Sequence, residues 1–288
     1  MPVTIPPRPA DTSVEAERVQ IDLLRKAPVS RRLRLAWSLS ATVIGVARRA
    51  LARAQPHASQ QDLDLRFVEL HYGPDLAAAL RAKVDSPLGP DRVFSMTELD
   101  LVAALRPVAE AFDALSVRYF LGGLVASSAH GVARASLDAD VIAELEPSHV
   151  ERLAQRLAGA YYTPIDQMRT AAAERRSFNL IHLATMFKID VFVSKGRPFD
   201  RSAAERARPH AIGDEGLDCR FFVASAEDTV LAKLEWFRLG GETSERQWWD
   251  IVGVLRVGAD TDRAYLRRWA AALGVSDLLE RALADAGD

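Results

Sequence analysis

Hydrophobic residues in the central part of the chain, from about residue 96 to residue 225, follow two alternating patterns. Short apolar runs with strand character occur at 117–121, 137–145, 177–183, 186–194 and 219–225. Helical spacing of apolar positions occurs at about 97–115, in the small-residue stretch that ends at His130, at about 147–158 and more weakly near 166–174. This alternation predicts an α/β or α+β fold, in which a sheet is flanked by helices.

The chain on either side of this region is predicted to be helical. Residues 11–84 carry a helical pattern in which Ser30 and Ser59 hold the position of helix N-caps, and residues 226–288 read as three or four helices, the first of them preceded by Ser225 as a candidate N-cap. Proline-rich MPVTIPPRPA is expected to be a disordered tail, and DSPLGPDRVFS a linker. The predicted organisation is a tail at 1–10, an all-α N-terminal module at 11–84, a linker at 85–95, an α/β core at 96–225 and a C-terminal helical region at 226–288.

Composition narrows the class of protein without indicating a function. Cys219 is the one cysteine among 288 residues, which excludes an intrachain disulfide framework and a cysteine-cluster zinc site, and we expect it to be buried and inert. No signal sequence opens the chain, and no apolar run approaches the roughly 20 residues of a membrane-spanning helix. A cytoplasmic protein is therefore expected.

Charge is distributed unevenly although the net charge is only −2. Residues 1–95 hold 14 Lys and Arg against 10 Asp and Glu, whereas residues 96–288 hold 23 against 29. From Arg25 to Gln61 there are eight basic residues and no acidic one. Such a stretch is typical of contact with RNA, of a membrane surface, of docking on the acidic half of the chain, or simply of a solvated arginine face.

Two carboxylates interrupt a strand that otherwise reads as buried. In LDADVIAEL, Asp138 and Asp140 share one face because side chains alternate along a strand. Two carboxylates this close repel each other unless a cation lies between them. Asp190 interrupts FKIDVFV in the same way, and three carboxylates on adjacent strands suit a two-Mg²⁺ site. Taken singly, the Asp-x-Asp pair is more typical of an exposed edge strand or turn, and Asp190 of a solvent-facing position on an antiparallel strand.

Residues between the first strand and the aspartates are candidates for binding an anion. Gly122 and Gly123 stand where a strand gives way to a helix, so their backbone N–H groups are predicted to approach a phosphate; a plain turn is the alternative. Arg134 is a second candidate for phosphate oxygens, or else a surface arginine. Ser127 is a weaker candidate, since a serine there, like His130, is more typical of helix packing.

A lysine inside an apolar arc is a further candidate. In EDTVLAKLEWFR (227–238), Lys233 falls among the apolar positions of a helix, so it must either reach out to solvent or meet an anion. Lys188, on the same strand face as Asp190, is a weaker candidate of the same kind. The aromatic and charged residues that begin the next helix, Arg246 to Asp250, are expected to pack in the helical core or to line a substrate groove.

The order of these residues resembles a known superfamily. Gly122-Gly123, a small-residue helix with His130-Gly131, Arg134, Ser136 and Asp138-x-Asp140 are similar to the signature of DNA polymerase β-like nucleotidyltransferases. The likeness covers about residues 96–255 and is greatest to the minimal nucleotidyltransferases and the AbiEii-type toxin family. Many relatives have Gly-Ser where this chain has Gly122-Gly123, so a hydroxyl contact to phosphate is missing here.

The resemblance implies a fold, a cofactor and a reaction. It implies a mixed sheet, two Mg²⁺ ions held by Asp138, Asp140 and Asp190, and a nucleoside triphosphate (ATP or another) approached by Lys233. The reaction implied is transfer of a nucleotidyl group to an RNA such as tRNA, or to a protein, in a toxin–antitoxin or phage-defence system with an antitoxin partner. Two alternatives remain: a non-catalytic binding or antitoxin subunit with this fold, and an enzyme that modifies a small molecule such as an aminoglycoside.

Overall fold

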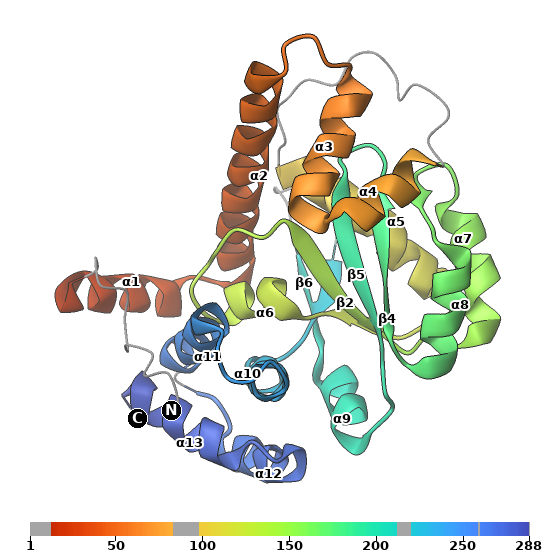
Figure 1. The fold of residues 1–288 in the computed structure, drawn as a ribbon. Helices are drawn as coiled ribbons and strands as arrows, with labels where there is room; N and C mark the ends of the chain where they lie inside the picture. The colour runs from red at the N-terminus through yellow and green to blue at the C-terminus, as the bar shows by residue number, and fades with distance from the viewer. Residues whose placement is uncertain (1–12, 83–97, 212–219, 259, 288) are drawn as a thin grey trace.

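The computed structural model describes residues 13–82, 98–211, 220–258 and 260–287. The predicted tail at 1–10, the predicted linker at 85–95 and the predicted burial of Cys219 lie outside these residues. The described residues form a mixed β-sheet flanked by helices, with helical regions at both ends of the chain, as the sequence predicts (Figure 1).

The sheet has seven strands in the order β3-β4-β5-β2-β1-β7-β6. Their bounds are Tyr119–Leu121 (β1), Asp138–Ala143 (β2), Tyr161–Tyr162 (β3), Ser177–His182 (β4), Phe187–Val193 (β5), Arg208–Ala211 (β6) and Arg220–Val223 (β7). The pairs β2/β5 and β1/β7 are parallel and the other neighbours are antiparallel. The sequence pattern predicts five of these strands; β3 and β6 are short edge strands with no apolar alternation of their own.

Helices cover the sheet and also form the regions that precede its first strand and follow its last strand in the chain. They are α1 (Val14–Lys26), α2 (Val29–Ala54), α3 (Gln60–Tyr72), α4 (Pro74–Arg81), α5 (Glu98–Ala114), α6 (Gly123–His130), α7 (Val150–Leu157), α8 (Ile165–Glu174), α9 (Pro198–Arg206), α10 (Ala226–Leu239), α11 (Glu245–Val257), α12 (Arg263–Leu273) and α13 (Ser276–Ala286), with a short 3₁₀ helix at Pro147–His149. Helix α6 packs on β2 and is itself contacted by α2, α10 and α11. The first strand-to-helix turn is therefore enclosed by both helical ends of the chain.

The N-terminal helices share their hydrophobic core with the sheet. Leu33, Trp37 and Ile44 of α2 and Phe67 of α3 belong to the same buried cluster as the strands. The C-terminal helices α10 to α13 form a second cluster around Trp248. Figure 1 shows α2 standing along one side of the sheet, with α3 and α4 lying over the end at which β5 begins. The range that the sequence sets apart as a helical module thus packs directly against the α/β core.

Helix caps are partly predicted from sequence. Ser59 caps α3 and Ser225 caps α10, each accepting a hydrogen bond from the backbone N–H three residues on. The expectation for Ser30 is wrong, because α2 begins at Val29 after Pro28 and Ser30 lies inside its first turn. Proline suits such a start, since the first N–H groups of a helix have no partner within it.

None of the helices within the described residues has both the length and the apolar character needed to cross a bilayer.

Candidate active site

The two strands that carry the predicted carboxylates lie side by side and run parallel. Asp140 of β2 is opposite Asp190 of β5, and Asp138 is opposite Lys188. Ala139 and Val141 point into the core on the other face. All three carboxylates therefore project from the same face of the sheet, which is the arrangement that the proposed metal site requires.

Lys188 lies between two of these carboxylates. Its Nζ atom is 2.7 Å from Oδ2 of Asp190 and 3.3 Å from Oδ2 of Asp138. Burial alone would lower the pKa of Lys188, but hydrogen bonding and the charges of Asp190 and Asp138 raise it overall. The Asn179 amide also donates a hydrogen bond to Asp190. Lys188, predicted as a phosphate ligand, is thus a counterion inside the acidic cluster.

Asp140 has no such partner. Within the described part of the chain, no hydrogen bond or ion pair reaches its carboxylate. Burial, followed by repulsion from Asp138 and Asp190, raises the pKa of Asp140 to about 6, although Lys233 and Lys188 act in the opposite direction. A cation bound beside such a carboxylate would therefore favour its ionised form.

Gly123 allows this arrangement because it has no side chain. Its φ of +50° is uncommon for other residues, and a Cβ atom would lie 1.6 Å from Oδ2 of Asp140. The N-terminus of α6 therefore approaches Asp140 directly. The Gly122 N–H donates to the Asp140 carbonyl at 3.0 Å, so it ties the turn to β2 and does not point to an anion as predicted.

The two predicted phosphate-binding cations converge on a carboxylate of this chain. Lys233 Nζ lies 2.9 Å from Oδ2 of Asp250, and Arg134 Nε lies 2.9 Å from Oδ1 of the same residue. Asp250 is buried on α11, Lys233 comes from α10, and Arg134 from the loop before β2. Asp250 was expected either to pack in the helical core or to line a substrate groove, and its role as a shared counterion was not predicted. The sequence signal for that role is an acidic residue on an otherwise apolar face of α11.

Ser127 and His130 do not face the carboxylates. Ser127 is buried and donates to the Leu124 carbonyl within α6, so its prediction as a nucleotide ligand is not supported by its position. His130 Nε2 lies 2.7 Å from the Ala224 carbonyl, and burial lowers its pKa to about 4. Ser127 is thus buried within α6 and His130 joins α6 to the end of β7, which agrees with the packing role that was their alternative.

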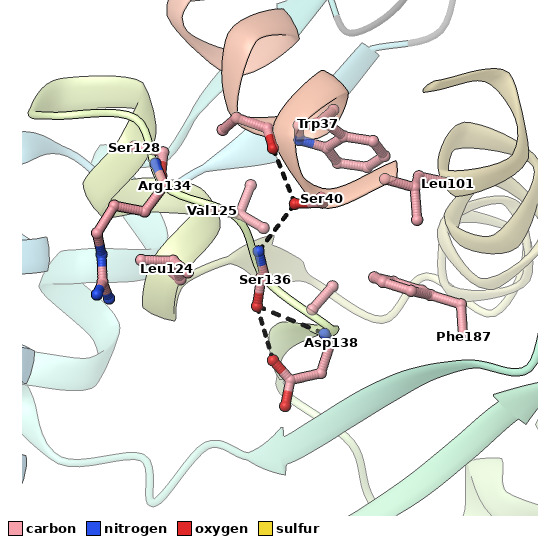
Figure 2. Close-up of a pocket in the computed structure, with 12 residues that line it drawn as sticks. Trp37, Ser40, Leu101, Leu124, Val125, Ser128, Arg134, Ser136, Asp138 and Phe187 are labelled. Atoms are coloured by element: carbon pink, nitrogen blue, oxygen red, sulfur yellow. Dashed lines mark hydrogen bonds between the residues drawn. The ribbon is translucent and has the colours of Figure 1, made fainter. Parts of the chain in front are cut away.

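Three further polar residues support the site: Ser136 belongs to the signature recognised in the sequence, whereas Ser40 and Tyr72 were not singled out there. The Ser136 hydroxyl donates to Oδ1 of Asp138 at 2.8 Å, and the Ser136 N–H donates to the Ser40 hydroxyl at 2.8 Å. The Tyr72 hydroxyl donates to the Leu137 carbonyl at 2.7 Å. Figure 2 shows the chain from Ser40 through Ser136 to Asp138 beside a small pocket walled by Trp37, Leu101 and Phe187.

The donor set fits a hard divalent cation. Carboxylate oxygens are the ligands that Mg²⁺ prefers, and Asp140 holds a charge without a partner among the described residues. The described residues hold no group of three His, Cys, Asp or Glu side chains already gathered in ligand geometry. The carboxylates of Asp138 and Asp190 instead share the ammonium of Lys188, which offsets one of their two negative charges. Asp140 is thus the carboxylate most in need of a cation.

Comparison with known proteins identifies no family. No family model matches the chain, and no curated protein matches it. Among solved structures, the chain is similar to an antigenic nucleotidyltransferase-like protein from Paracoccidioides brasiliensis, with 14% identity and a TM-score of 0.36 over 65% of this chain and 93% of that chain. A likeness this distant says nothing about the reaction.

Proposed function

We propose that the chain is a Mg²⁺-dependent nucleotidyltransferase that moves a nucleoside monophosphate from a nucleoside triphosphate to a hydroxyl group of an acceptor. The observation that carries this proposal is the convergence of Asp138, Asp140 and Asp190 on one sheet face, with the N-terminus of α6 against Asp140 at Gly123. A helix N-terminus favours phosphate, and clustered carboxylates favour the metal that accompanies it.

The residues have separate roles in the proposed reaction. Asp138, Asp140 and Asp190 would hold Mg²⁺, which when bound polarises the phosphates and makes the acceptor hydroxyl more acidic. The acceptor oxygen bonds to the α-phosphorus, the bond to the bridging oxygen breaks, and pyrophosphate leaves with that electron pair. Asp190 takes the hydroxyl proton, and the pKa of this carboxyl group is raised by burial, which suits a general base.

Lys233 and Arg134 complete the proposed phosphate site. Asp250 holds both cations beside α6, so their side chains are ordered before any triphosphate arrives. The positive charge of Lys233 also partly offsets the rise in the pKa of Asp140. Positive groups held in place in this way stabilise charge that develops on the phosphates without reorganisation during the reaction.

RNA is the acceptor that the surface of the chain supports best. Arg31, Arg49 and Arg53 are exposed on α2 in a stretch that has no acidic residue, which suits a phosphate backbone. A protein acceptor remains the second option. The proposal also includes a toxin or phage-defence role with an antitoxin partner. This part of the proposal is supported by the sequence resemblance alone.

A labelled transfer assay tests the reaction and identifies the acceptor. The purified chain is incubated with each α-labelled nucleoside triphosphate, Mg²⁺ and, separately, total RNA, cell protein or an aminoglycoside. We expect label on RNA, and a loss of roughly 1,000-fold in D138N and D190N, because several kcal/mol of charge stabilisation disappear with each ligand. Asp166→Asn, at an exposed carboxylate on α8, should keep full activity.

One observation favours a second candidate, a non-catalytic nucleotide-binding protein. Lys188 already forms ion pairs with Asp138 and Asp190, two of the carboxylates that would hold the metal, so a nucleotide held by Lys233 and Arg134 without metal is the second candidate. A binding protein would transfer no label to any acceptor and would retain nucleotide in the presence of EDTA. An enzyme that modifies small molecules would put the label on the aminoglycoside.

A further inference from the structure

The N-terminal helices reach the candidate metal ligands through two short chains of hydrogen bonds. In the first, the Ser40 hydroxyl of α2 donates to the Ala36 carbonyl at 2.8 Å and accepts the N–H of Ser136 at 2.8 Å. Ser136 in turn donates its hydroxyl to Asp138, as Figure 2 shows. Ser40 is buried, so the direction of its hydroxyl is set by these two partners.

The second chain begins at the last residue of α3. The Tyr72 hydroxyl donates to the carbonyl of Leu137, the residue directly before Asp138. The Tyr72 ring also lies below the ammonium of Lys188, with Nζ 5.5 Å from the ring centre. Tyr72 therefore contacts both the backbone that carries Asp138 and the counterion of Asp138 and Asp190.

Both helices are anchored at the strands that bear the carboxylates. The Arg48 guanidinium of α2 donates to the carbonyl of Thr185, in the turn between β4 and β5, and pairs with buried Asp64 of α3 at 3.8 Å. Leu33 and Trp37 hold α2 in the core that it shares with the sheet. Ser40 and Tyr72 thus project from a rigid support.

We propose that Ser40 and Tyr72 are positioning residues of the metal centre, supplied by the N-terminal helices. The inference rests on the proposed function for the identity of the metal ligands. Asp138 begins β2 and follows an irregular loop, so its carboxylate depends on contacts outside the sheet for its direction. Residues that orient metal ligands govern metal affinity without touching the metal. The N-terminal helices are then part of the metal site, and the site would not form correctly without them.

Binding of Mn²⁺ alone, followed by the electron paramagnetic resonance signal of the free ion, tests this role without nucleotide. We expect Ser40→Ala and Tyr72→Phe each to weaken Mn²⁺ binding by about 10-fold, the lower end of the effect of residues that orient metal ligands. Wild-type binding is the reference, and circular dichroism checks that each variant folds.

The chain offers a matched control for each variant. Thr42 of α2 donates to the carbonyl four residues earlier at 2.8 Å, as Ser40 does, but lies on the exposed side of the helix. Tyr161 donates to the Ala104 carbonyl at 2.7 Å from the edge strand β3. Thr42→Ala and Tyr161→Phe remove equivalent hydrogen bonds and should leave Mn²⁺ affinity within about 2-fold of wild type, since neither hydroxyl contacts a ligand-bearing segment.

A double variant separates positioning from general loosening of the structure. Ser40 and Ser136 act on Asp138 through one chain, so Ser40→Ala with Ser136→Ala should weaken Mn²⁺ binding no more than the worse single variant. If Ser40→Ala does not fold, Ser136→Ala and Tyr72→Phe decide the matter.

The outcomes distinguish this proposal from the proposed function. Mn²⁺ affinities of Ser40→Ala and Tyr72→Phe that match those of the controls, or independent effects in the double variant, would overturn the positioning role. A wild type that binds no Mn²⁺ would overturn it as well, since no centre would remain to position. A wild type that binds Mn²⁺ but transfers no label refutes only the enzyme, and the positioning role is then decided by Mn²⁺ affinity alone.

Discussion

At the scale of single residues, the Asp140 carboxylate lies in the space that a side chain on Gly123 would need. The φ of +50° and the 1.6 Å separation between a hypothetical Cβ atom and Oδ2 of Asp140 are two separate reasons for glycine at this position. The first concerns the backbone and the second concerns the carboxylate. A control variant that strains the backbone at a positive φ, without bringing a methyl group near a carboxylate, separates these two reasons.

Gly123→Ala is expected to abolish Mn²⁺ binding and nucleotidyl transfer, and to lower the free energy of unfolding by about 1–3 kcal/mol through backbone strain. Gly159→Ala is the control, because Gly159 has a φ of +79° but no atom within 4 Å of the added methyl group. It should show the strain in urea unfolding and keep both activities. Full activity in Gly123→Ala would show that Asp140 is not a ligand.

At the scale of elements, Asp250 joins three segments that are distant in sequence. It binds Lys233 of α10 and Arg134 of the loop after α6 from its own position on α11. The two cations predicted for phosphate therefore also connect the second hydrophobic cluster to the sheet.

Asp250→Asn should lower the free energy of unfolding by about 3 kcal/mol, because it leaves two cations without their buried partner. This value is the lower end of the roughly 3–5 kcal/mol that breaking a buried ion pair costs, because the Arg134 side chain is 32% exposed. Glu280→Gln breaks the exposed pair with Arg267, where both side chains are more than half exposed, and should leave the free energy of unfolding nearly unchanged because solvent screens the pair. Equal losses in urea titrations would remove the special role of Asp250.

At the scale of the whole molecule, two partly buried groups give opposite dependences of stability on pH. Folding lowers the pKa of His130 from 6.5 to about 4, so its contribution is complete above pH 6.5 and is lost as the pH falls towards 4. Folding raises the pKa of Asp140 from 3.8 to about 6, so the folded state gains stability as the pH falls through the same range. The two trends oppose each other in the wild type.

Removing one group should expose the trend of the other. Between pH 6.5 and 4, we expect His130→Gln to become more stable relative to wild type as the pH falls, by up to about 3 kcal/mol. His57→Gln, at an exposed histidine, is the control. The free energy of unfolding in urea at several pH values measures the effect, and parallel profiles for all three proteins would contradict it.

Sequence patterns predict the elements of this molecule better than their arrangement. Alternation in LDADVIAEL and FKIDVFV gives both strands, and the serines at 59 and 225 give two helix starts, because these signals lie within a few residues of each other. The cap predicted at Ser30 is wrong by two residues, because α2 begins at Val29 and Pro28 is its N-cap residue. The strand order and the parallel pairing of β2 with β5 have no local signal.

The face of each strand that carries its carboxylates could be predicted from the sequence, because side chains alternate along any strand whatever its neighbours are. Which charges meet depends on how distant segments pack. The register of β2 on β5 places Lys188 between Asp138 and Asp190, and the packing of α11 on α6 brings Asp250 to Lys233 and Arg134. The N-terminal helices reach Asp138 in the same way, across 96 residues from Ser40 to Ser136. Such partners are set by how distant segments pack, and the periodicity of a single segment carries no record of them.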